Sequence, residues 1–118
     1  MNKYNARKTP YEGYIFDSGK ECQRYKDLRL LEKAGELYDL RVHPVYLLQG
    51  KFICHGKNIR AIKYEADFEY KESTPIADYP DAYITIVEDV KGMQTEVFRI
   101  KSKLFMKRYP YCNFRIVE

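Results

Sequence analysis

The sequence has no tryptophan, only three cysteines and no long apolar segment. The cysteines, Cys22, Cys54 and Cys112, are odd in number and far apart, and no Cys-x-x-Cys pair occurs, which disfavours a zinc site. Reduced thiols are typical of a cytoplasmic protein. No apolar run approaches the length that spans a membrane, and the N-terminus has no signal-peptide core. We therefore expect a soluble, cytoplasmic protein without a membrane partner.

The rest of the composition is that of one globular domain with a mild excess of positive charge. A single domain over residues 1–118 is long enough to bury a core without disulfides. The net charge of +4 permits a nucleic-acid partner without requiring one. Two groups of basic residues are candidates for holding a polyanion, although a solvated surface explains them equally well: Lys3, Arg7 and Lys8 near the start, and Lys101, Lys103, Lys107 and Arg108 near the end.

Two helices are indicated. The first spans residues 18–35, and its start carries a capping box made by Ser18 and Glu21. The second spans residues 95–108. Residues 1–12 are polar and basic, and they predict a flexible arm.

Strands are expected between and after the helices. Residues 62–70 alternate cleanly, with Tyr64, Ala66 and Phe68 on one face and Asp67 on the other, which indicates a half-buried strand. Further strands are expected over 40–49, with Pro44 marking an edge or bulge, and over 52–55, 83–91 and 114–117. A final strand-helix-strand unit favours a parallel crossover. We predict an α/β (mixed α+β) fold of order α-β-β-β-α-β, with a mixed sheet flanked by two helices.

Two acidic clusters carry the strongest functional signal. Side chains at positions i and i+2 of a strand share a face, so Asp89 and Lys91 face the same way. If the two acidic strands are neighbours, Asp67 joins them. Two carboxylates and an ammonium then converge, which is the arrangement needed to hold a divalent cation and activate a water beside a phosphodiester.

The order of these motifs resembles the PD-(D/E)xK nuclease superfamily. The corresponding runs are Ser18-Gly19-Lys20-Glu21, Tyr64 to Phe68, and Val87 to Gly92. The match is closest to phage junction-resolving enzymes of the endonuclease I type, and the chain also looks like a family of small phage proteins of unassigned function. Ala66 stands where the superfamily usually has proline.

The resemblance implies a restriction-endonuclease-like core and a Mg²⁺-dependent (or Mn²⁺-dependent) endonuclease that cuts DNA. By this resemblance, the metal would be held by Asp67, Asp89, Glu21 and the Val90 carbonyl. Lys91 would act on the scissile phosphate or on the attacking water. The substrate would lie near Lys101 and Lys103. The resemblance also implies branched DNA as the substrate and the cytoplasm of a bacterial host as the location. It implies a homodimer as well, in which the first helix of each site can come from the partner subunit.

Other interpretations stay open. If no shared site exists, Asp67 and Asp89 are simply exposed acidic residues on strands, and Glu21 is only a helix-capping residue. Glu88 points opposite Asp89 in a regular strand, so a salt bridge suits it better. His43 and His55 favour structural or exposed roles. A non-catalytic module that binds DNA or a host protein is the rival function, and a ribonuclease would use the same site.

Overall fold

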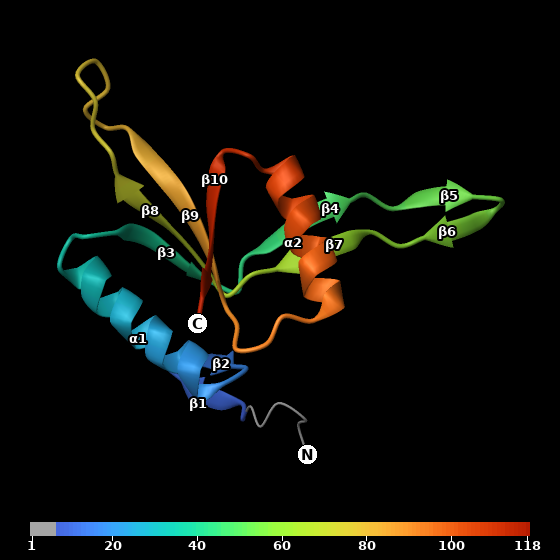
Figure 1. Ribbon diagram of the computed structural model, residues 1–118, viewed down its shortest axis with the longest axis horizontal. Coiled ribbons are helices and arrows are strands. Elements are labelled where there is room, and N and C mark those ends of the chain that lie inside the picture. Colours follow the sequence, from blue (N-terminus) through green and yellow to red (C-terminus); the bar gives the residue numbers. More distant parts are fainter. Residues whose placement is uncertain (1–6) are drawn as a thin grey trace.

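A computed structural model describes residues 7–118, and its centre is a four-stranded mixed sheet (Figure 1). The strand order is β10-β9-β8-β3, with β9 and β10 parallel and the other neighbours antiparallel. The strands are β3 (Tyr38–Val42), β8 (Phe68–Ser73), β9 (Tyr83–Val90) and β10 (Cys112–Val117). The predicted mixed sheet and its parallel closing pair are confirmed. No helix within residues 7–118 is both long and apolar enough to cross a membrane.

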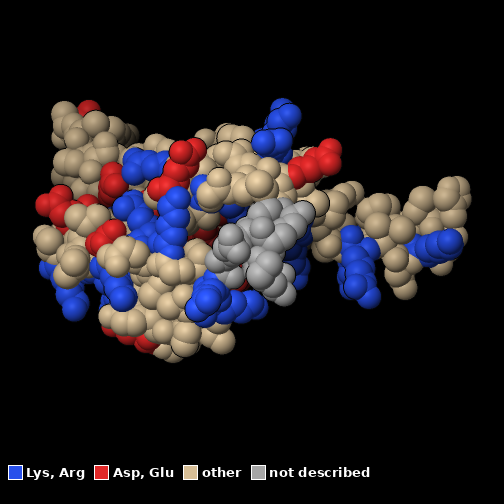
Figure 2. Space-filling model, turned by 60° about the horizontal axis from the view of Figure 1, so that its bottom comes forward, with Lys and Arg blue, Asp and Glu red and all other residues tan. Residues whose placement is uncertain are grey.

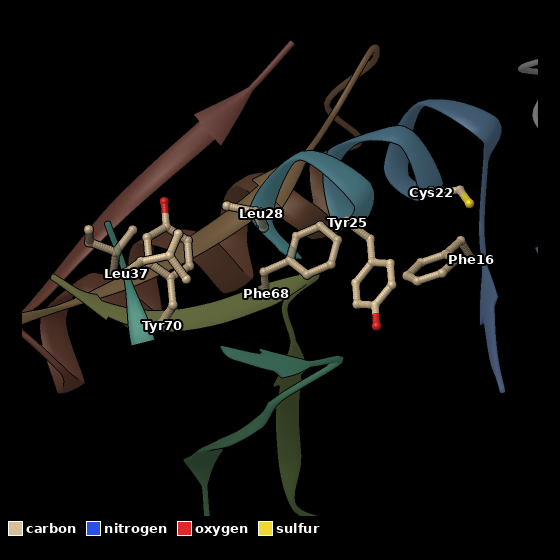
Figure 3. Close-up of a cluster of buried hydrophobic side chains, with 8 residues drawn as sticks. Phe16, Cys22, Tyr25, Leu28, Leu37, Phe68 and Tyr70 are labelled. Carbon is tan, nitrogen blue, oxygen red and sulfur yellow. The ribbon is translucent and has the colours of Figure 1, made fainter. Parts of the chain in front are cut away.

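The helices α1 (Gly19–Lys33) and α2 (Glu96–Arg108) lie on opposite faces of this sheet. Neighbouring residues of a strand point to opposite faces, and Ile86 packs in the α1 cluster while Val87 packs in the α2 cluster. The α1 cluster, whose side chains appear in Figure 3, contains Phe16, Cys22, Tyr25, Leu28, Leu37, Phe68, Tyr70 and Ile86. The α2 cluster contains Leu48, Tyr64, Ala66, Val87, Phe98 and Phe105.

Helix α2 buries less of its apolar surface than its sequence suggests. Thr95 caps the helix, because the Thr95 hydroxyl accepts the Phe98 amide at 3.1 Å. Phe98 and Phe105 lie in the core. Four other apolar residues of the same helix are exposed: Val97, Ile100, Leu104 and Met106.

The helices and the strands of the central sheet follow each other as α1-β3-β8-β9-α2-β10, which confirms the predicted order. Two hairpins add to it. The first pairs β1 (Thr9–Tyr11) with β2 (Tyr14–Phe16), so the arm predicted over residues 1–12 is wrong for residues 9–11. Pro10 is accommodated because this two-stranded sheet leaves an edge free. Lys3 lies outside the described residues.

The second addition is a long projection between β3 and β8, here called the β4–β7 arm (residues 45–65). Its base pairs β4 (Val45–Gln49) with β7 (Ile62–Glu65), and its outer part pairs β5 (Phe52–Cys54) with β6 (Lys57–Ile59). The strands predicted over 40–49 and 62–70 are therefore each divided in two. The first division falls at His43, whose φ of 55° leaves the extended region, and at Pro44, which has no amide hydrogen for the ladder.

Candidate metal site

The two strand divisions meet and bring a cluster of polar side chains together beside β9. The His43 amide donates to the Asp67 carbonyl at 2.9 Å, and the Ala66 amide donates to the Pro44 carbonyl at 3.0 Å. The Asp67 amide donates to the Glu88 carbonyl of β9 at 3.1 Å. Asp67 is consequently 8% exposed, and it does not lie on a solvent-facing strand surface as the alternation suggested.

Asp67 lies in a group with Glu21 and His43, whose ligand atoms all fall within 4.8 Å of one another. The three residues come from α1, from the turn after β3 and from the segment before β8. Glu21 belongs to the same chain as Asp67, so the site needs no helix from a partner. His43 was not predicted as a site residue, although it stands directly before Pro44, where a break in the strand was expected.

Glu21 is held at the start of α1 by several partners. The Ser18 hydroxyl accepts the Glu21 amide at 3.1 Å, which confirms the predicted cap. The reciprocal bond differs, because the Glu21 carboxylate accepts the Asp17 amide at 3.1 Å rather than the Ser18 amide. Its other oxygen lies 2.7 Å from Nε2 of His43. Burial raises the pKa of Glu21 above its usual range, although the His43 and Asp17 bonds oppose the shift.

Asp67 is the most perturbed carboxyl group of the site. Burial raises the pKa of Asp67 to about 9, and the negative charges of Asp89 and Glu21 add to the shift. One of its oxygens accepts the Val90 amide at 2.6 Å, which opposes the increase. Three acidic side chains thus share a space that disfavours three negative charges.

Asp89 and Lys91 face the same side of the chain, as the strand period predicted. Asp89 is 1% exposed, and one of its oxygens, Oδ2, accepts the Tyr64 hydroxyl. Its other oxygen, Oδ1, lies 3.2 Å from the Lys91 ammonium, close enough for an ion pair, although the contact does not meet hydrogen-bond geometry. Within residues 7–118, Oδ1 is the only buried side-chain polar atom that lacks a hydrogen-bond partner. The Lys91 ammonium also sits 4.9 Å from the centre of the Phe98 ring.

Glu88 belongs to the opposite face, and the salt bridge expected for it is confirmed. Its two oxygens accept hydrogen bonds from Arg24 of α1 at 2.8 and 2.7 Å, and the Tyr70 hydroxyl donates to one of them. Glu88 is fully buried, so this pair ties α1 to the centre of the sheet. It is a structural carboxylate that takes no part in the candidate site.

The described basic residues that are predicted to contact DNA are exposed or half-buried. Lys101 is half-buried on α2, while Arg7, Lys8 and Lys103 are exposed. Their contact with DNA stays a prediction. Val90 contributes its amide to Asp67, and a role for its carbonyl likewise stays a prediction.

The chemistry of this group suits a divalent cation. Carboxylate oxygens are the ligands that Mg²⁺ and Mn²⁺ prefer, and an imidazole is also acceptable to Mn²⁺. Asp89 Oδ1 has no hydrogen-bond partner besides its ion pair with Lys91, and burial together with the Asp89 and Glu21 charges raises the pKa of Asp67, so added positive charge would be stabilised here. Asp89 lies outside the tight group of Glu21, His43 and Asp67, yet its charge acts on Asp67, so the two parts are electrostatically one site.

Comparison with known proteins gives one match. A family model described as "Protein of unknown function (DUF1064)" matches residues 1–117. No curated protein and no solved structure matches the chain. Because the match covers nearly the whole sequence, the chain belongs to the DUF1064 family.

Proposed function

We propose that the protein is a metal-dependent endonuclease that hydrolyses phosphodiester bonds in DNA. The observation that carries the proposal is the group of buried carboxylates beside one ammonium. Asp89 Oδ1 has no hydrogen-bond partner and lies 3.2 Å from the Lys91 ammonium, and the charges of Asp89 and Glu21 help to raise the pKa of Asp67. Several buried carboxylates facing a single ammonium are costly to keep, so a site that holds them together has a use for them. The resemblance of the ordered motifs to the PD-(D/E)xK nucleases points to the same chemistry.

Asp67, Asp89 and Glu21 are the proposed ligands of Mg²⁺ or Mn²⁺, with the Val90 carbonyl as a further candidate. A bound cation would polarise a phosphate oxygen and lower the pKa of a coordinated water. Asp67 must lose its proton before it can act as a ligand, because its pKa is raised to about 9. His43, 2.7 Å from Glu21, is a positioning residue that fixes the orientation of the Glu21 carboxylate.

Lys91 has the proposed role of stabilising negative charge on the phosphate. Its ammonium is half-buried between Asp89 and the Phe98 ring, so it is held in place before a substrate arrives. An ammonium fixed in this way stabilises charge that develops in the transition state without needing to reorganise. Tyr64 stays a neutral donor, because burial and the Asp89 charge raise its pKa, and it holds Asp89 in position.

Branched DNA is the proposed substrate, and a homodimer the proposed active form. One carboxylate cluster makes one incision at a time, so paired incisions on two strands need two chains related by symmetry. Each chain supplies its own Glu21, His43 and Asp67, so the dimer would serve to pair two sites and would not be needed to complete either one.

A cleavage panel tests the proposal. Purified protein is incubated with duplex, single-stranded, flap and four-way DNA and with RNA, in Mg²⁺, Mn²⁺, Ca²⁺ or excess chelator. We expect cleavage of DNA in Mg²⁺ or Mn²⁺, binding without cleavage in Ca²⁺, and no cleavage in chelator. Asp89→Asn should abolish cleavage, while the exposed loop variant Asp78→Asn should cut like the wild type. Metal-independent cleavage, or DNA binding without cleavage under all conditions, would contradict the proposal.

A further inference from the structure

The β4–β7 arm extends away from the rest of the molecule as a two-stranded ribbon (Figure 1). Every residue from Gln49 to Arg60 is exposed, and these include apolar side chains, with Ile53 at 72% and Phe52 at 44%. The ribbon turns at His55 and Gly56, whose φ angles of 49° and 74° are those of a tight hairpin turn. An isolated two-stranded ribbon is marginally stable in water, so its exposed surface gains from a partner.

The arm has an excess of positive charge, and its one acidic residue, Glu65, lies at its base, at the end of β7. Residues 45–64 contain four basic residues, Lys51, Lys57, Arg60 and Lys63, and no Asp or Glu. The whole chain has 17 Asp and Glu among 118 residues, so a segment of this length would carry about three by composition alone. Figure 2 shows Lys and Arg side chains along the outer arm without an acidic neighbour. The surface is therefore complementary to a polyanion.

The base of the arm is the candidate metal site. Strand β4 begins two residues after His43, and β7 ends two residues before Asp67. Backbone hydrogen bonds between His43 and Asp67 and between Pro44 and Ala66 close the base, at 2.9 and 3.0 Å. A polyanion held along the arm is consequently led to the carboxylates and to Lys91.

We propose that the β4–β7 arm binds the backbone of double-stranded DNA and holds it at the metal site. This inference rests on the proposed nuclease function. The six residues from Gln49 to Cys54 span at most about 20 Å, which is the rise of about six base steps at ~3.4 Å each. The cations hold phosphates on that stretch, and the exposed apolar side chains near the tip pack against sugars and bases.

A second copy of this chain fits the arm less well than DNA. A two-fold symmetric contact brings the same patch of both chains together. Two arms would then place four basic residues against four others, and no carboxylate of the segment 45–64 is present to separate them. Like charges opposed in an interface destabilise it.

The test measures the salt dependence of DNA binding in the absence of metal. Lys51→Gln/Lys57→Gln is compared with the charge-matched control Lys26→Gln/Lys33→Gln on α1, where both lysines are exposed. Duplex binding is followed by fluorescence anisotropy from 50 to 200 mM salt. Each lost phosphate contact reduces the slope of log K against log salt by about 0.9. We expect the arm variant to lose about 1.8 from the slope, whereas the control keeps the wild-type value.

In wild-type protein, the two arm contacts should account for about a 12-fold loss of affinity over this salt range. Equal slopes for the arm variant and the control would overturn the proposal, as would an absence of DNA binding by wild type. The proposal would also be overturned if the wild type is a dimer and the arm substitutions dissociate it without changing DNA binding, because the arm would then join two copies of the chain. Because no metal is present, these results are independent of cleavage, and a protein that binds through the arm but never cuts would refute only the nuclease function.

A crosslink gives a second, direct readout. Cys54 is exposed in the arm, whereas Cys22 is buried and Cys112 half-buried. A photoreactive group on Cys54, in a Cys112→Ser background, should form an adduct with duplex DNA. The same group placed on α1 by Lys33→Cys, with Cys54→Ser, should not. An adduct at the α1 position equal to that at Cys54 would contradict the proposal.

Discussion

Replacing Asp67 by asparagine separates the electrostatic cost of the site from its binding role. The side chains have nearly the same shape, and the asparagine oxygen can still accept the Val90 amide that Asp67 accepts at 2.6 Å. The variant should therefore fold. What it lacks is the carboxyl group whose pKa burial and the Asp89 charge raise from 3.8 to about 9.

The raised pKa predicts how stability depends on pH without metal. Between its unfolded and folded pKa values, Asp67 carries a proton in the folded protein but not in the unfolded chain. The stability that this proton supplies is complete below about pH 4 and is lost as pH rises towards 9. One proton changes the free energy of unfolding by about 1.4 kcal/mol per pH unit. Relative to Asp67→Asn, the wild type should lose on the order of 3 kcal/mol of stability between pH 6 and pH 8.

Urea denaturation in chelator at pH 6, 7 and 8 measures this difference, and the exposed loop variant Asp78→Asn serves as the control. A divalent cation should reverse the loss at pH 8. At 100 times its dissociation constant it adds about 2.7 kcal/mol to the wild type and nothing to Asp67→Asn. Parallel pH dependence of the wild type and Asp67→Asn, or equal stabilisation of both by Mn²⁺, would refute the reasoning.

Four further outcomes are expected. Lys91→Ala should lower the rate of DNA cleavage by at least about 10²-fold with its fold intact by circular dichroism, and cleavage at the wild-type rate would remove Lys91 from the site. Arg24→Ala should cost about 3 kcal/mol in urea denaturation, because it leaves the buried Glu88 carboxylate without its partner. Arg115→Ala, which breaks an exposed 3.6 Å pair with Glu72, should cost less than about 1 kcal/mol, and similar losses for the two would contradict the ranking. Light scattering should give a homodimer on four-way DNA, and a monomer both free and bound would exclude paired incision by two chains.

Local periodicity predicted the parts of the site that lie within one strand. The two-residue period placed Asp89 with Lys91 and placed Glu88 on the other face, and all three positions are confirmed by the ion pairs they make. The cap at Ser18 was predicted as reliably, because it depends on residues three apart in one turn.

The rest of the site depends on where strands divide, which periodicity does not reveal. Tyr64, Ala66, Phe68 and Tyr70 alternate without interruption, yet the first two pack against α2 and the last two against α1. The change of side at Asp67 is what turns its carboxylate inward. His43 lies in the site for a similar reason. Its φ is positive, whereas the strand predicted over residues 40–49 implies an extended backbone there.

The projection of the β4–β7 arm into solvent was not predicted, because the amino-acid composition of the arm is typical of a buried strand. Phe52, Ile53 and Ile59 are residues that normally mark burial in a sheet. Only the three-dimensional arrangement shows that these side chains stay in solvent. Their exposure is a long-range property, set by how β4 and β7 leave the central sheet.

A crystal structure of the protein with Mn²⁺, with the metal located by its anomalous scattering, tests the central claim most directly. We expect a peak bound by carboxylate oxygens of Asp67 and Asp89, with Glu21 or a water next to it, and no peak there in Asp67→Asn crystals. We also expect Oδ1 of Asp89, which has no hydrogen-bond partner, to contact the ion. Saturating Mn²⁺ that leaves this cluster without a peak would contradict the assignment of the site and the nuclease mechanism built on it.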